Sequence, residues 1–261
     1  MNLAALVEYD GTRFAGFQRQ PPSRGPTVQA ALEAALGRVA GVAVRVEAAG
    51  RTDSGVHASG QTINVHVPTR HAPATWQRAL NALLPPEIAI IAVCEVADDF
   101  RARWSALSRS YRYRILCRAV RAPLRERYVW RVAQPLDGAA MAEAAALVAG
   151  EHDFGAFGSS PRDRRATGTR GSTVRRMLAT SVAPSLVHPD ELECHFTANA
   201  YLTGMVRRLV GTLVHVGEGR LSVAGFAAVL ASADLARAAP AAPACGLCLT
   251  GVAYPARTVM W

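Results

Sequence analysis

The stretch IAIIAVCEVADDFRARWSALSRSYRYRILC, residues 88–117, contains the junction on which the fold prediction depends. Residues 88–96 form an apolar run typical of a buried strand, and residues 108–117 alternate between two faces. Tyr111, Tyr113 and Ile115 share one face of this second strand, while serine and arginine occupy the other. We place the boundary between two halves of the protein in the intervening residues, 97–107.

The same order of elements is predicted on both sides of this junction. Before it, strands are predicted at 3–9, 42–48, 61–67 and 88–96, and helices at 28–39 and 74–84. After it, strands are predicted at 108–117, 173–182, 191–198 and 247–254, and helices at 138–149, 202–216 and 222–231. The sequence therefore predicts an α+β protein of two ferredoxin-like βαββαβ halves, 1–103 and 104–261. We expect mostly antiparallel sheets, joined into one central sheet around an active-site cleft.

The charge of the chain favours a polyanionic partner. Of 261 residues, 29 are basic and 20 acidic, giving a net charge of +9, and every basic residue is arginine. Chemistry that needs a lysine amine is therefore excluded. Ten arginines lie in 101–131 among tyrosines and tryptophans, with Glu126 as the only acid there, and six more lie in 162–176. Arginine combined with aromatic faces suits RNA, so we expect most of both clusters to bind phosphate.

Targeting and cysteine patterns indicate a cytoplasmic protein. Residues 1–9 have no basic region ahead of their apolar run, which argues against a signal peptide, and no apolar run approaches membrane-spanning length. The five cysteines are odd in number and widely spaced, as expected in a reducing compartment. A zinc site from Cys245 and Cys248 would need Cys194 and His195, both in strand-like runs. The cysteine pattern therefore argues against a zinc site.

One loop has the composition of a chemical centre. Residues 50–60 contain glycines that permit tight turns, and Asp53 lies between Arg51 and His57. From spacing alone, Asp53 is either a turn former or a catalytic carboxylate, and His57 either a structural residue or a general base. No nucleophile elbow, zinc-protease, phosphate-loop or paired-carboxylate pattern appears elsewhere.

These motifs together resemble the tRNA pseudouridine synthase A family. The resemblance rests on Tyr9-Asp10-Gly11-Thr12, Phe14–Gln20, Thr27-Val28-Gln29, Gly50–Ala58, Asp99–Arg103, Ser110–Tyr113, Gly150–Phe154, Asn199–Leu202, Met205-Val206-Arg207 and Gly246-Leu247, in that order along nearly the whole chain. It implies an RNA-modifying isomerase that converts uridine to pseudouridine at positions 38, 39 and 40 of the tRNA anticodon stem-loop, without a cofactor. It also implies a homodimer whose tRNA clefts use both subunits.

The resemblance assigns roles to individual residues. Asp53 becomes the nucleophile, Arg207 its ion-pair partner, and Tyr111 the residue that stacks on the target base and can serve the C5 proton. Arg51 fills the gap left by the flipped uridine or binds the RNA backbone at that point. His57 positions Asp53 or contacts RNA, and Arg19 and Gln18 contribute to substrate binding. Whether the carboxylate adds to C6, attacks C1′ or takes a C2′ proton stays open.

Two other functions compete with catalysis. An RNA chaperone on the same scaffold would lack the nucleophile, whereas Asp53, Tyr111 and Arg207 are all present. A DNA-binding protein would explain the net charge, but no helix carries a base-reading pattern.

Overall fold

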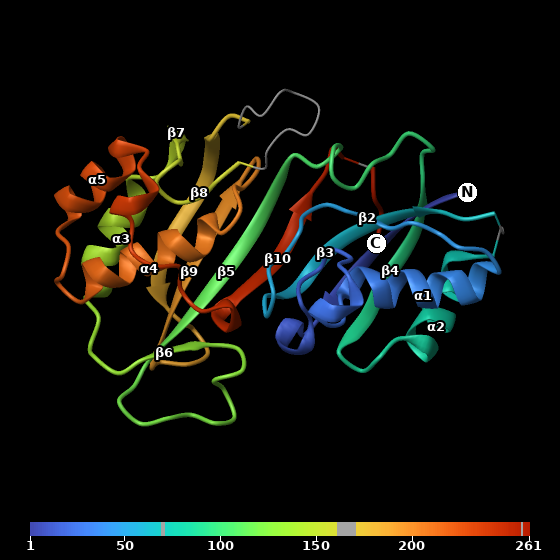
Figure 1. The fold of residues 1–261 in the computed structure, drawn as a ribbon, viewed down its shortest axis with the longest axis horizontal. Coiled ribbons are helices and arrows are strands. Elements are labelled where there is room, and N and C mark those ends of the chain that lie inside the picture. Colours follow the sequence, from blue (N-terminus) through green and yellow to red (C-terminus); the bar gives the residue numbers. More distant parts are fainter. Residues whose placement is uncertain (69–70, 161–170, 257) are drawn as a thin grey trace. The chain divides into compact units, whose positions relative to one another are not determined.

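The computed structural model describes residues 1–68, 71–160, 171–256 and 258–261 (Figure 1). The chain divides into two compact units, 1–109 with 248–261, and 110–247. The prediction of an α+β fold in two halves is confirmed. The predicted division differs in two places, because residues 104–109 and 248–261 both belong to the first unit.

The first unit is a sheet with two helices. Its elements are β1 (Asn2–Tyr9), α1 (Val28–Ala40), β2 (Glu47–Ala48), β3 (His57–His66), α2 (Pro73–Leu83), β4 (Ile88–Val96) and β10 (Leu247–Ala253). The strands lie in the order β4-β1-β3-β10, with β2 paired to β3. The pairs among β1 to β4 are antiparallel, whereas β10 runs parallel to β3. Short 3-10 turns follow β1 at Gly11–Arg13 and Pro22–Arg24.

The second unit has a sheet with three helices. Its elements are β5 (Ser108–Cys117), β6 (Trp130–Val132), α3 (Gly138–Ala146), β7 (Gly150–Asp153), β8 (Val174–Pro184), β9 (Glu191–Ala198), α4 (Met205–Gly217) and α5 (Val223–Ser232). The strand order is β5-β9-β8-β7, with β6 parallel to β5. Helix α3 packs on β8, α4 and α5. Two further 3-10 turns, Leu235–Arg237 and Ala244–Gly246, precede β10.

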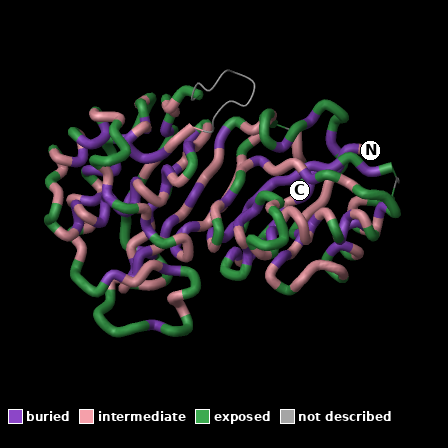
Figure 2. Tube along the Cα trace, in the orientation of Figure 1, coloured by how far each residue is buried: buried purple, intermediate pink, exposed green. Residues whose placement is uncertain are grey.

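Each unit has its own apolar core. In the first unit, Trp76, Ile63 and Leu32 are almost fully buried; in the second, the Phe157 and Phe226 rings stack at 5.7 Å between centroids. Figure 2 shows that buried residues follow the strands, whereas the loop after β5 is largely exposed. This burial supplies most of the favourable free energy of folding.

Side-chain caps fix the helix starts that the sequence predicted. Thr27 accepts the Ala30 N–H at 3.3 Å at the start of α1, and Asp137 accepts the Ala140 N–H at 2.9 Å at the start of α3. The strand predicted at 42–48 is reduced to Glu47–Ala48. Side chains from α1 bind both backbone groups of Val46, which are therefore lost to a strand ladder.

Candidate active site

The Asp53 loop, residues 50–56, connects β2 to β3 in the first unit. Thr52 and Val56 are buried, whereas Asp53 is partly exposed. The Val56 N–H donates to the Asp53 carbonyl at 3.2 Å and closes a turn around the carboxylate. The loop therefore presents one acidic side chain on a backbone that is anchored on both sides.

A strap formed by residues 10–17 holds this loop from one side. The Phe17 N–H donates to the Thr52 carbonyl at 3.1 Å. The Phe14 carbonyl accepts from the Ser54 hydroxyl at 3.2 Å and from the Gly55 N–H at 3.3 Å. Because these bonds reach the residues directly before and after Asp53, the strap fixes the direction in which its side chain leaves the backbone.

Two glycines allow the strap to lie against the loop. A Cβ added at Gly11 would lie 1.9 Å from the Val56 carbonyl oxygen, far inside van der Waals contact. Gly16 has φ of +102°, and a Cβ there would lie 2.9 Å from the Thr52 carbonyl oxygen. Side chains at either position would push the strap and the loop apart.

Buried polar side chains hold the loop from its other side. Gln61 on β3 donates to the Gly50 carbonyl at 2.7 Å and accepts the Gly50 N–H at 3.3 Å. The hydroxyls of Tyr9 and Thr52 are hydrogen-bonded at 2.8 Å, and burial raises the pKa of Tyr9, which keeps it protonated. The sequence reading assigned neither Gln61 nor Tyr9 a role. The available signal was a glutamine in an otherwise apolar strand face.

His57 connects the loop to the strap rather than facing solvent. It is buried, and its Nδ1 accepts the Gly11 N–H at 3.1 Å. The same nitrogen lies 3.2 Å from Asp10 Oδ1. His57 Nδ1 is therefore within reach of both the Gly11 N–H and the Asp10 carboxylate, which also accepts the Thr12 N–H at 2.9 Å.

The three other predicted substrate-binding residues of this unit are exposed. In the described part of the chain, Arg51 makes no hydrogen bond and no ion pair, and desolvation together with the like charge of Arg103 lowers its pKa. Arg19 pairs with Glu33 on α1 at 3.4 Å, which partly satisfies its charge. Gln18, which directly follows the strap residue Phe17, is exposed. Arg51 lies two residues before Asp53 in the same loop, whereas Arg19 and Gln18 lie at the surface just after the strap.

Tyr111 and Arg207 belong to the second unit. Tyr111 lies buried on β5, and its ring meets Tyr201 edge-on at 5.0 Å between centroids. Arg207 lies on α4, where its Nε donates to the Ala242 carbonyl at 2.7 Å. The Ala242 N–H donates back to the Arg207 carbonyl at 2.9 Å, so both ends of this arginine are held by one segment. Its pairing with Asp53 stays a prediction.

Part of the first arginine cluster forms ion pairs within the protein. Arg101 forms two 2.6 Å hydrogen bonds with Glu47, and Arg114 and Arg125 pair with the fully buried Glu191 at 2.7 Å and 3.0 Å. These three arginines already have acidic partners, and the expectation that most of the cluster binds phosphate stays a prediction. Their acidic partners are distant in sequence, so a count of local acids could not reveal them.

The second cluster lies mostly outside the described residues. Its arginines at 162, 164, 165 and 170 fall within 161–170. Arg175 and Arg176 are the second and third residues of β8, and Arg175 donates to the Ser172 carbonyl at 2.9 Å. The expectation of phosphate binding by this cluster therefore stays a prediction.

Among the described residues, no group of three or more histidine, cysteine or acidic side chains is arranged to hold a metal ion. Burial raises the pKa of Cys194 to about 12, and the Cys245 thiol donates to the Val129 carbonyl at 3.4 Å. Within the same part of the chain, no helix is both long and apolar enough to cross a membrane.

Known proteins resemble this chain along almost its whole length. A family model described as tRNA pseudouridine synthase matches residues 5–105 and 144–255. The tRNA pseudouridine synthase A of Chloroflexus aurantiacus is 46% identical over 260 residues, covering 99% of this chain and 91% of the relative. The proteins of that name from Roseiflexus castenholzii and Methylobacterium nodulans are 47% and 46% identical, covering 97% and 96% of this chain and 91% and 94% of the relatives. A chain from a solved Cbf5–Nop10–Gar1 complex aligns with 81% of this chain and 45% of its own length, at 12% identity and a TM-score of 0.33.

Proposed function

This chain belongs to the tRNA pseudouridine synthase family, and from that premise we propose that it acts on positions 38, 39 and 40 of the tRNA anticodon stem-loop with Asp53 as its nucleophile. It is an enzyme that isomerises uridine in tRNA to pseudouridine. The site of action within tRNA and the residue roles are our proposal.

The observation that carries the assignment of Asp53 is the anchoring of its loop. The strap bonds the residues on either side of Asp53, and Gln61 bonds both backbone groups of Gly50. A nucleophile held in this way does not lose conformational entropy when the substrate arrives. This anchoring supports the assignment of Asp53 as the nucleophile.

The chemistry explains the need for a carboxylate. The C1′–N1 bond of uridine breaks, the uracil turns, C5 bonds to C1′, the proton on C5 leaves, and N1 gains a proton, so the product is an isomer of the substrate. Asp53 can add to C6, attack C1′ or take a proton from C2′ to begin this sequence. In each route the carboxylate must be ionised, and we propose that Arg207 supplies the compensating positive charge.

Tyr111 and Arg51 complete the proposed site. Tyr111 offers an aromatic ring for the target base and a hydroxyl for the C5 proton. A uridine inside a stem must leave the helix before it reaches Asp53, and Arg51 would occupy the vacated space or bind the local phosphate. The lack of an intramolecular partner for Arg51 among the described residues supports this role.

We also propose a cytoplasmic homodimer whose tRNA clefts use both subunits, working without metal or organic cofactor. Size-exclusion chromatography with light scattering tests the dimer: a mass of one chain at working concentration would contradict it.

Pseudouridine mapping tests the substrate assignment. The purified enzyme is incubated with unmodified tRNAs that carry uridine at positions 38, 39 or 40, and each product is sequenced after pseudouridine-specific chemical labelling. We expect new pseudouridine at these positions, and none in transcripts whose uridines there are replaced by cytidine. Modification found only elsewhere in the tRNA would refute the anticodon assignment.

A further inference from the structure

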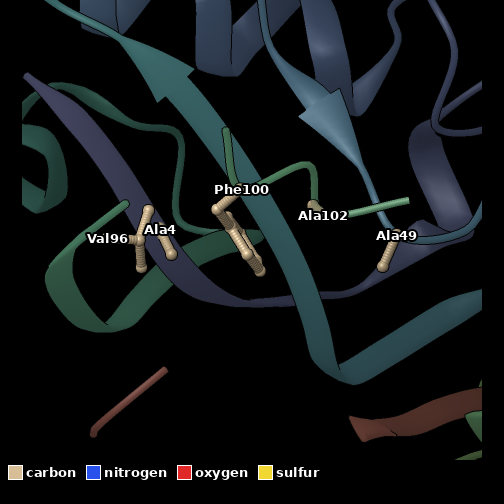
Figure 3. Close-up of a cluster of buried hydrophobic side chains, with 5 residues drawn as sticks. All are labelled: Ala4, Ala49, Val96, Phe100 and Ala102. Atoms are coloured by element: carbon tan, nitrogen blue, oxygen red, sulfur yellow. The ribbon is translucent and has the colours of Figure 1, made fainter. Parts of the chain in front are cut away.

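The segment 100–104 is anchored beside the Asp53 loop by a small apolar cluster. Figure 3 shows Phe100 and Ala102 packed in this cluster with Ala4, Val96 and Ala49. Ala49 directly precedes the Asp53 loop, so the cluster ties the loop and the segment to the same part of the first unit. All five members are at least 91% buried, which makes this attachment rigid.

Buried hydrogen bonds fix the backbone of the same segment. Asn2 donates to the Phe100 carbonyl at 3.0 Å, and Asn64 accepts the Ala102 N–H at 2.8 Å. The Tyr254 hydroxyl donates to the Ala102 carbonyl at 2.7 Å. The backbone that carries the neighbouring residues Arg103 and Trp104 is therefore held in place before any substrate binds.

Arg109 brings the next residues close to the loop. One of its terminal nitrogens, Nη2, donates to the Ala49 carbonyl at 3.0 Å and to the Arg103 carbonyl at 2.5 Å. Two carbonyls that accept from one nitrogen lie within a few ångström of each other. The backbone of Arg103 therefore lies next to the start of the Asp53 loop, and its charge is close enough to lower the pKa of Arg51.

Arg103 and Trp104 have features of a ligand site rather than of a folding contact. The Trp104 side chain is 70% exposed, although tryptophan is usually well buried. The Arg103 guanidinium carbon lies 4.9 Å from the centre of the indole ring, so the pair is already stacked. Unlike Arg101, Arg103 forms no ion pair with a carboxylate of the described residues.

We propose that Arg103 and Trp104 form a subsite for an unpaired nucleotide of the RNA substrate, next to the nucleotide that reacts with Asp53. The base stacks on the exposed indole, and the edge of the Arg103 guanidinium donates to the phosphate while its face stays on the ring. This inference rests on the proposed function, because it names the residues that bind the RNA strand beside the uridine that reacts with Asp53.

Substitution of Trp104 tests the subsite. We expect Trp104→Ala to raise KM for tRNA roughly 5- to 150-fold, the effect of losing one base–aromatic stack, with little change in kcat once the tRNA is bound. Trp104→Phe keeps an aromatic face and should recover most of the affinity. The matched control is Trp261→Ala, since Trp261 is also in the first unit and 48% exposed. Thermal unfolding checks that each variant is folded.

Binding measurements separate this inference from the proposed function. Asp53→Ala protein, with and without Trp104→Ala, is titrated with anticodon stem-loop RNAs that each carry one abasic nucleotide. One abasic position should weaken binding to the protein that keeps Trp104 and leave binding to the Trp104→Ala protein unchanged. Equal affinity of both proteins for every RNA would overturn the subsite even if pseudouridine still forms. A Trp104→Ala variant with altered mass by light scattering and unaltered RNA affinity would also overturn it, and would assign the surface to protein association.

Discussion

Replacing Gly11 with alanine should separate the strap from the Asp53 loop without touching any residue proposed to react. Gly11 lies in the 3-10 turn after β1, and its N–H binds His57. The added methyl carbon would lie 1.9 Å from the carbonyl oxygen of Val56. Because this neighbour is backbone, a side-chain rotation cannot relieve the overlap.

The size of the effect follows from this distance. An ordinary contact begins near 3.4 Å, so the strap and the loop must separate by about 1.5 Å in total. Overpacking of this kind costs about 1–3 kcal/mol of unfolding free energy. A displacement of about 1 Å at the reacting group costs about 100-fold in rate, so we expect kcat/KM to fall about 100-fold.

The assay compares initial rates of pseudouridine formation by Gly11→Ala and by wild type on one unmodified tRNA. Gly251→Ala on β10 is the control, because a Cβ there meets nothing within 4 Å. It should keep wild-type activity. If Gly11→Ala stays folded and retains kcat/KM within threefold of the control, the strap does not position Asp53 and the reasoning fails.

Three further predictions concern charge. Glu191→Ala leaves two arginines without their buried partner and should lower the unfolding free energy by about 3 kcal/mol in urea titration; a loss below 1 kcal/mol would show that the pair is dispensable. Arg125 holds the pKa of Asp190 at about 2, below its usual 3.8, so its stabilising effect is complete above pH 4 and is lost as the pH falls through 2. Asp190→Asn should therefore flatten the acid limb of a stability–pH curve, and an unchanged limb would contradict this. Arg51→Ala should reduce the slope of log tRNA affinity against log salt concentration by about 0.7–0.9. Arg101→Ala should leave this slope unchanged, because Arg101 is already paired with Glu47. Equal slopes for the two variants would contradict the assignment.

The elements that sequence predicted best are those with strong apolar periodicity. The strands at 88–96, 108–117 and 191–198 begin and end where predicted, because each alternates or stays apolar up to a polar boundary. The strands β6 and β7 were not predicted. Strand β6 has three residues and is partly exposed, and β7 has four residues and is largely exposed. Both depend on pairing with longer strands, β6 with β5 and β7 with β8.

Long-range contacts set the limits of prediction at the site. The glycine-rich composition around Asp53 marks its loop directly, whereas the hydrogen bonds of Gln61 to Gly50 depend on how β3 packs. Arg101 and Glu47 are 54 residues apart in sequence, so a count of local charges could not reveal their ion pair. The last strand, β10, was assigned to the second half by chain order, but its parallel pairing with β3 places residues 248–261 in the first unit.

A single-turnover measurement on Asp53 variants tests the central proposal most directly. Wild type, Asp53→Asn and Asp53→Ala are each mixed in excess with unmodified tRNA, and pseudouridine is followed while tRNA binding is measured separately. We predict no pseudouridine from either variant and tRNA affinity within a few-fold of wild type. Pseudouridine formation by the Asp53→Ala protein would show that this carboxylate is not the nucleophile.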